Sequence, residues 1–229
     1  MEPFVPQYQG APWPAGPTPE DGVGVLHVYA LPRPGVDDDL LDLVRACGPA
    51  MTGYPLDPQL PAGEPGAGLL HATVEMLADA PAAAYDQAAR DDLVAALRKE
   101  LAGVPPFVTE AGPPIAGLAG VVVDLWPDAE FLALAERVRG AVRRTRGDAA
   151  LRHSGGRPHV SAAYAYGAAS SDRLNTVLRG ITPRRVPFTI DRVHLLDVSW
   201  RFDAGLPGWR MSWTPVAEIP LGGVPRRAA

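Results

Sequence analysis

The chain has 229 residues, a hydrophobic content of 47% and a net charge of −5 at pH 7. This length fits one domain of moderate size or two small lobes around a real core. The negative balance argues against a tight, sequence-blind binder of long nucleic acid.

The composition also bears on the compartment. No apolar run approaches the roughly 20 residues of a membrane span, and the first residues lack the basic start and apolar stretch of a secretory signal. The single cysteine, Cys47, excludes an intramolecular disulfide and a thiolate metal cluster. We therefore expect a cytoplasmic protein with no membrane attachment. Lys99 is the only lysine, and the abundance of Arg, Ala, Gly and Pro suggests a bacterial, GC-rich genome.

The first half of the chain alternates predicted strands and helices. Residues 1–21 are rich in Pro and Gly and predict a flexible arm. The remainder, 22–229, is predicted to form one bilobal domain. Its first half contains, in order, a strand at 22–32, a helix at 37–48, a loop at 51–68, a strand at 69–77 and a helix at 82–103.

The second half repeats this order. It contains strands at 106–114 and 117–127, a helix at 128–147, a strand at 157–166, a helix at 170–181 and a closing hairpin at 187–202 and 208–221. Strand, helix, histidine-bearing strand, helix and strand therefore occur twice. This repetition predicts two similar α+β lobes, each with one histidine-bearing strand.

The two histidine-bearing strands share a local pattern. His71 is followed by Thr73 in "LLHATVEML", and His159 is followed by Ser161 in "RPHVSAAYAY". Successive side chains of a strand point to opposite faces, so each histidine shares a face with its hydroxyl. Strict alternation sets Tyr164 on the opposite face from His159.

Imidazole and hydroxyl groups together suit phosphodiester chemistry. Imidazole accepts or donates a proton near neutral pH, so two histidines beside one phosphate can act as base and acid. The hydroxyls of Thr73 and Ser161 can stabilise charge on the non-bridging phosphate oxygens. Alternation puts Glu75 on the face of His71, where we expect it to meet solvent. The sequence shows no metal-binding motif, so we expect no metal ion and no cofactor.

This pair of motifs resembles the 2H phosphoesterase superfamily, which includes the bacterial RNA 2′,3′-cyclic phosphodiesterases also named 2′-5′ RNA ligases. The motifs are His71-Ala72-Thr73-Val74 and His159-Val160-Ser161-Ala162. The resemblance implies an α+β fold of two pseudo-symmetric lobes, each an antiparallel sheet with two helices, with the active cleft between the lobes. It further implies hydrolysis of a 2′,3′-cyclic phosphate or a 2′-linked phosphodiester, with reversible ligase activity in some members.

The resemblance also implies roles for the residues. We expect His159 to act as base on water and His71 as acid to the leaving oxygen, although the sequence leaves the order open. Thr73, Ser161 and Arg157 are expected to bind phosphate, and the implied substrate is a small nucleotide or an RNA end, with no obligate protein partner. The chain departs from the family where Tyr164 stands in place of a frequent arginine.

Other residues have more than one explanation. His27, Tyr29, His153 and Tyr164 are candidates for lining the same cleft, although we favour packing for His27 and Tyr164 and an ordinary loop for His153. The departure at Tyr164 motivates a second hypothesis, a nucleotide- or RNA-end-binding protein that keeps the fold without turnover. A run of arginines between residues 137 and 157 suits a phosphate-bearing ligand or a solvated helix face.

Overall fold

The computed structural model describes residues 24–151, 156–203, 205 and 208–223. The predicted arm at 1–21 and the candidate His153 lie outside these residues. The strands are β1 (Gly24–Ala30), β2 (Leu56–Pro58), β3 (His71–Met76), β4 (Phe107–Ala116), β5 (Gly120–Trp126), β6 (His159–Ala165), β7 (Val186–Ile190), β8 (Arg192–Asp203) and β9 (Gly208–Pro220). The main helices are α1 (Asp38–Met51), α2 (Gln87–Leu101), α3 (Ala129–Arg146) and α4 (Ser171–Leu178).

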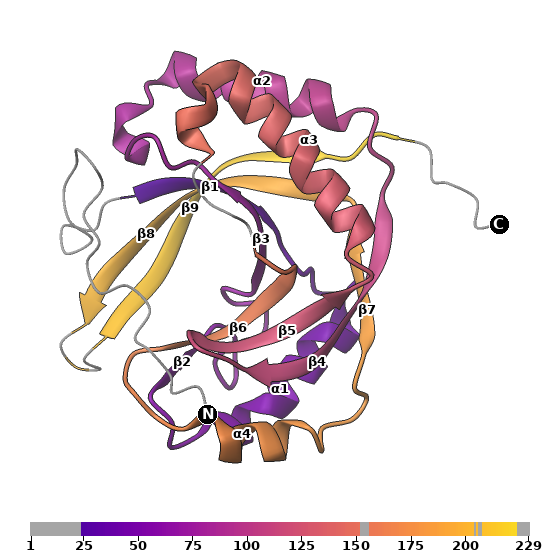
Figure 1. Ribbon diagram of the computed structural model, residues 1–229, viewed down its shortest axis with the longest axis vertical. Helices are drawn as coiled ribbons and strands as arrows, with labels where there is room; N and C mark the ends of the chain where they lie inside the picture. Colours follow the sequence, from indigo (N-terminus) through magenta and orange to yellow (C-terminus); the bar gives the residue numbers. More distant parts are fainter. Residues whose placement is uncertain (1–23, 152–155, 204, 206–207, 224–229) are drawn as a thin grey trace.

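The strands form one strongly curled antiparallel sheet. Its order is β7-β4-β5-β6-β3-β1-β8-β9, and β2 pairs with β6. The sheet has two halves that join at the two strands bearing the histidine motifs, β3 and β6 (Figure 1). At this junction His71 lies opposite Ser161, and Ala72 lies opposite Val160.

Each half of the sheet is covered by two helices. Helices α2 and α3 pack together against β9 and β3, whereas α1 and α4 pack together against β7 and β4. Figure 1 shows the two helix pairs at opposite ends of the molecule, with the curled sheet between them. The expected α+β fold, with two helices for each half, is confirmed. Because α1 lies beside α4, each half draws on both ends of the chain.

Helix termini follow local chemistry. The sequence predicts the second helix from residue 82, yet α2 begins at Gln87 because the Asp86 carboxylate accepts a hydrogen bond from the Ala89 amide. Residues 82–84 form only a short 3₁₀ turn. The buried faces of α2 and α3 consist of apolar side chains at helical spacing, such as Leu93, Leu97 and Leu101 of α2.

Two strand predictions were wrong in detail. The loop at 51–68 contains the short strand β2, whose backbone pairs with residues 163–165 of β6. The predicted strand at 187–202 is two strands, because β7 pairs with β4 whereas β8 pairs with β1 and β9. The chain crosses between the two halves of the sheet at Asp191, whose carboxylate forms ion pairs with Arg33 and Arg192.

A β-bulge lies at the last residue of each histidine motif. Between β1 and β3 the register shifts so that Val74 has no partner opposite it, and between β5 and β6 the same happens at Ala162. An extra residue reverses the inward and outward alternation beyond it. The bulges therefore decide which side chains after each motif face the concave side of the sheet.

Within the part of the chain that the structure describes, no helix has the length and apolar character needed to span a membrane.

Candidate functional site

A cavity of about 460 Å³ lies at the junction of the two half-sheets. Its walls include side chains from both histidine-bearing strands, from β1 and from the β4–β5 turn. The candidate residues that line it are His27, Tyr29, Thr73, Arg157, His159, Ser161 and Tyr164. Met76, Asp124 and Trp200 also line it, and none of these three was identified from the sequence.

His159 stands at the start of β6 with its imidazole partly exposed on the cavity wall. Its Nδ1 lies 2.7 Å from the carbonyl oxygen of Arg157. A carbonyl only accepts hydrogen bonds, so this contact places the proton on Nδ1 and leaves the lone pair of the neutral ring on Nε2. This tautomer suits a ring that accepts a proton through Nε2.

Arg157 has a partner that the sequence did not reveal. Its Nε lies 2.8 Å from Oδ1 of Asp124, whose side chain is largely buried and whose residue pairs with His159 in the β5–β6 ladder. The guanidinium remains exposed on the cavity rim. Among the described residues that line the cavity, this arginine and this aspartate are the charged side chains apart from the histidines, and their charges compensate each other.

The two motif hydroxyls both reach the cavity. Ser161 is buried opposite His71 in the β3–β6 register, and Thr73 is half-buried opposite Tyr29. The antiparallel register thus sets the hydroxyl of the second motif beside the histidine of the first. Two hydroxyls from different motifs therefore line the same cavity as His159.

His71 does not line the cavity directly. Its side chain is fully buried, with Nδ1 2.8 Å from the Leu69 carbonyl oxygen and Nε2 2.9 Å from the Tyr164 hydroxyl. The Tyr29 ring stacks on it at 4.3 Å between ring centroids, and Trp213 meets it edge-on at 5.8 Å. The expectation that both imidazoles face one cleft is thus met by His159 alone, because Tyr164 covers His71.

Tyr164 reaches this position because of the bulge at Ala162. Alternation predicts that its side chain points away from Ser161, yet its hydroxyl lies 3.2 Å from the Ser161 hydroxyl and lines the cavity. The ring also packs edge-on against Trp200, with 5.0 Å between ring centroids. Tyr164 therefore connects His71 to the cavity.

His27 repeats the arrangement of the two motif histidines on β1. Its Nδ1 lies 3.1 Å from the Val25 carbonyl oxygen, and its ring is tilted against Tyr29 at 5.1 Å between centroids. His27 and Tyr29 are both largely buried, so each contributes an edge to the cavity wall.

Burial has a strong effect on His71. Desolvation, opposed by the Leu69 carbonyl and assisted by the nearby imidazoles of His27 and His159, lowers the pKa of His71 from 6.5 to about 3. The unfolded chain binds this proton at the ordinary pKa. Burying His71 in its neutral form therefore does not lower the free energy of unfolding above pH 6.5, but it lowers that free energy progressively as the pH falls from 6.5 toward 3.

The lowered pKa of His71 predicts how the free energy of unfolding depends on pH. Between about pH 6.5 and about pH 5, the free energy of unfolding of the wild type is expected to fall by about 2 kcal/mol more than that of His71→Gln, since one proton corresponds to about 1.4 kcal/mol per pH unit. Urea denaturation at several pH values measures both curves. Parallel curves for the two proteins would contradict the assignment.

Glu75 corrects a sequence-based expectation. The bulge at Val74 turns its side chain away from the cavity, where it is 1% exposed and its Oε2 lies 2.5 Å from Nη1 of Arg139 on α3. It does not meet solvent. This buried ion pair connects the histidine-bearing strand β3 to the helix that covers it.

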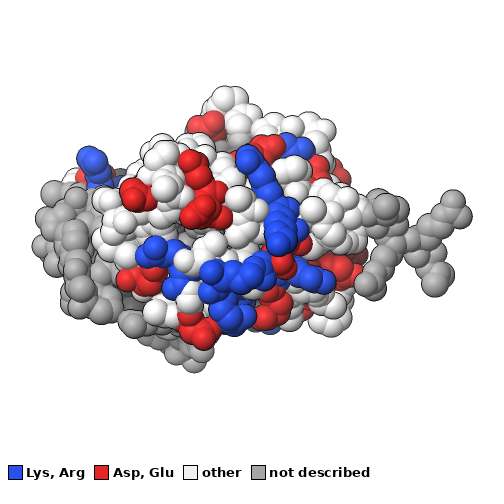
Figure 2. Space-filling model, turned by 90° about the horizontal axis from the view of Figure 1, so that it is seen from above, with Lys and Arg blue, Asp and Glu red and all other residues white. Residues whose placement is uncertain are grey.

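The other arginines of α3 are also matched by acidic groups. Figure 2 shows the face formed by α2 and α3, where Lys and Arg form a band with acidic side chains beside it. The ion pairs of this face join Arg137 and Arg144 to Glu100, Arg143 to Asp148, and Arg146 to Asp79. None of these arginines lines the cavity. These arginines of α3 therefore agree with a solvated helix face, which is one of the two explanations that the sequence offered for them.

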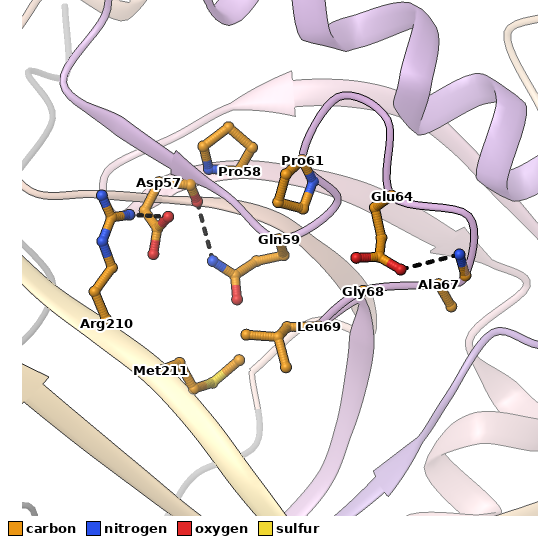
Figure 3. A pocket seen from close by; sticks show the side chains of 11 residues that line it. Asp57, Pro58, Gln59, Pro61, Glu64, Ala67, Gly68, Leu69, Arg210 and Met211 are labelled. Carbon is orange, nitrogen blue, oxygen red and sulfur yellow. Dashed lines mark hydrogen bonds and ion pairs between the residues drawn. The ribbon is translucent and has the colours of Figure 1, made fainter.

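A second cavity, of about 610 Å³, lies between the 57–69 segment and β9 (Figure 3). Arg210 forms an ion pair with Asp57 there, and the Gln59 side-chain amide donates to the Asp57 carbonyl. Leu69 and Met211 complete its apolar side. This cavity contains none of the site residues identified from the sequence.

Over the described ranges, no group of three or more His, Cys, Asp or Glu side chains is placed to hold a metal ion.

Several solved structures share the fold of this chain. The chain is similar to TT0787 of Thermus thermophilus, with a TM-score of 0.59, 17% identity, and coverage of 87% of this chain and 98% of that one. A structure described as a phosphoesterase matches with a TM-score of 0.58 and 16% identity over 86% of this chain and 98% of that one. Escherichia coli LigT complexed with 3′-AMP matches with a TM-score of 0.59 and 14% identity over 87% of this chain and 98% of that one.

No protein-family model and no curated protein matches the sequence. The identities to the solved structures lie below 25%, so they establish the fold and not the reaction. The fold expected from the two motifs is therefore confirmed.

Proposed function

We propose that this chain is a metal-independent phosphoesterase that hydrolyses a 2′,3′-cyclic phosphate or a 2′-linked phosphodiester of a nucleotide or RNA end. One observation carries the proposal: His159, Ser161 and Thr73, drawn from both histidine motifs, line one cavity where the two half-sheets meet. The fold shared with LigT and with a structure named as a phosphoesterase supports the same class of reaction.

The groups present match the demands of the reaction. The Nε2 lone pair of His159 accepts a proton from the attacking water, and the Ser161 and Thr73 hydroxyls donate to the phosphate oxygens as charge develops there. The leaving oxygen takes a proton that His71 of the first motif supplies. In the direction of 2′-5′ ligation the same groups exchange roles.

The cavity also favours a substrate of low charge. Its volume, about 460 Å³, is in the range of small-molecule sites, roughly 300–1,000 Å³. Because Asp124 compensates Arg157, the lining suits the single negative charge of a cyclic phosphodiester better than a polyphosphate. LigT was solved in complex with 3′-AMP, ATP and NADP+, which is consistent with a nucleotide ligand.

The direct test is turnover of 2′,3′-cyclic AMP, GMP, CMP and UMP, and of a 2′-5′-linked dinucleotide, in excess chelator. We expect at least one of these to be hydrolysed at a rate that the chelator does not change. Chromatography of the products against 2′- and 3′-monophosphate standards shows which P–O bond is broken. Loss of turnover in chelator, with recovery on adding a metal ion, would overturn the metal-independent reaction.

A second function is favoured by one feature of the site. The hydroxyl of Tyr164 covers His71, and this suits a protein that binds a nucleotide or RNA end without hydrolysing it. Equilibrium binding of the same compounds, with no product after prolonged incubation, would support this second function.

A further inference from the structure

Tyr164 stands between the buried histidine and the cavity. Its hydroxyl is 2.9 Å from Nε2 of His71 and 3.2 Å from the Ser161 hydroxyl, and its side chain lines the cavity that His159 also lines. His71 itself is fully buried. In this arrangement any proton that passes between His71 and a molecule in the cavity passes through the Tyr164 hydroxyl.

The protonation state of this chain of groups follows from its ends. The Leu69 carbonyl can only accept a hydrogen bond, so Nδ1 of the neutral His71 ring carries its proton and Nε2 carries the lone pair that faces the Tyr164 hydroxyl. The single proton of that hydroxyl is also within reach of Ser161 Oγ, to which it donates. Burial raises the pKa of Tyr164 to about 12, so the phenol stays protonated near neutral pH. The resting site therefore holds a neutral imidazole and a neutral phenol.

A bound anion changes this balance. Among the described residues, the titratable groups around His71 are His27, His159, Tyr29 and Tyr164, and the Trp213 ring meets it edge-on. A phosphate beside Tyr164 adds a negative charge that favours protonation of His71. Nε2–H then donates to the phenol oxygen, and the phenol O–H turns toward the phosphate.

We propose that Tyr164 is the catalytic acid of this site, and that His71 is a positioning residue that supplies the proton through it. This inference rests on the proposed function. When water attacks phosphorus, His159 takes its proton and a new P–O bond forms. As the P–O bond to the leaving ribose oxygen breaks, that oxygen takes the phenolic proton of Tyr164, and Tyr164 takes the Nε2 proton of His71.

The cycle closes without another reactant. His71 ends neutral, with its Nδ1 proton still donated to the Leu69 carbonyl, and His159 ends protonated. His159 returns its proton to solvent, and His71 takes one up when the next anion binds. The position of Tyr164 is fixed by the bulge at Ala162, by the two hydroxyl contacts and by the edge of Trp200, as a proton-transfer group requires.

The first test compares Tyr164→Phe, His71→Gln and the double variant on the cyclic nucleotide that the wild type hydrolyses best. Each single substitution is expected to lower kcat/KM by about 10²-fold or more, and the double variant is expected to be no worse than the poorer single variant, because both act in one step. If Tyr164→Phe equals or exceeds the wild type, Tyr164 merely covers His71 and the relay is overturned. Multiplicative losses in the double variant would also overturn it.

The second test requires no turnover. Titration calorimetry with sulfate, in buffers of different ionisation enthalpy, measures proton uptake on anion binding. Because the pKa of His71 starts at about 3 and a nearby anion raises it by roughly 1–3 pH units, the titration is run near pH 5, where we expect uptake of a fraction of a proton per site in the wild type and a large reduction in both single variants. Uptake without hydrolysis of any cyclic nucleotide would refute the proposed function and keep the coupling. Sulfate binding without uptake in the wild type would refute the coupling, whatever the activity.

Discussion

Substituting glutamine for His159 is expected to lower kcat/KM for a 2′,3′-cyclic nucleotide by about 10²–10⁴-fold, the usual contribution of a general base or acid. His159 is the motif histidine whose side chain lines the cavity directly, and the Arg157 carbonyl fixes its tautomer. Glutamine keeps a polar side chain of similar reach and cannot take the proton. Initial rates over a range of substrate concentrations separate kcat from KM, and the loss should fall mainly on kcat.

A matched control comes from another histidine. His194 lies on β8 and does not line the cavity, so His194→Gln should keep kcat/KM within about threefold of the wild type. Circular dichroism and thermal unfolding of both variants show whether each is folded. Equal activity of folded His159→Gln and wild type would exclude His159 from the chemistry and favour the nucleotide-binding function.

The sequence predicted the site best where the pattern was local. The spacing of each histidine from its hydroxyl set Thr73, His159 and Ser161 on the face that forms the cavity. Alternation along a strand holds over two residues whatever the rest of the fold does. The same local signals predicted the four main helices and most strands.

Prediction from alternation failed beyond the motifs for one physical reason. A bulge depends on how two strands are paired. Nothing in the sequence around Val74 or Ala162 indicates that the residue has no partner on the neighbouring strand. The two errors are of the same kind. The side chain of Glu75 turns to a buried partner and not to solvent. The side chain of Tyr164, which alternation set on the far face although the residue was also a candidate for lining the cleft, turns to the cavity.

Long-range pairing explains the remaining differences. The strand β2 is short and is flanked by prolines, so its extended conformation depends on its backbone pairing with β6. The association of α1 with α4 and the separation of β7 from β8 at Asp191 depend on how distant segments meet. Asp124 could not be identified as a site residue from the sequence, because only the β5–β6 register brings it beside His159 and Arg157.

Replacing Arg139 with methionine is expected to lower the free energy of unfolding by about 3–5 kcal/mol, which is the usual effect of leaving a buried charge without its partner. Methionine retains much of the apolar stem, so the lost group is the cation that lies 2.5 Å from the buried Glu75 carboxylate. Urea denaturation followed by tryptophan fluorescence measures the change. A change below about 1 kcal/mol would mean that Glu75 is neutral or well solvated in the folded protein.

Two further variants separate the ion pair from helix packing in general. Arg143→Met breaks a pair in which both side chains are largely exposed, so it should change stability by no more than about 1 kcal/mol. Adding Glu75→Gln to Arg139→Met should recover a large part of the loss, because the double variant no longer buries a carboxylate that has lost the Arg139 cation. Since Glu75 follows the bulge next to His71 and Thr73, this pair also fixes the strand that carries the first motif. Loss of activity in the folded Arg139→Met variant, with recovery in the double variant, would connect the position of β3 to catalysis.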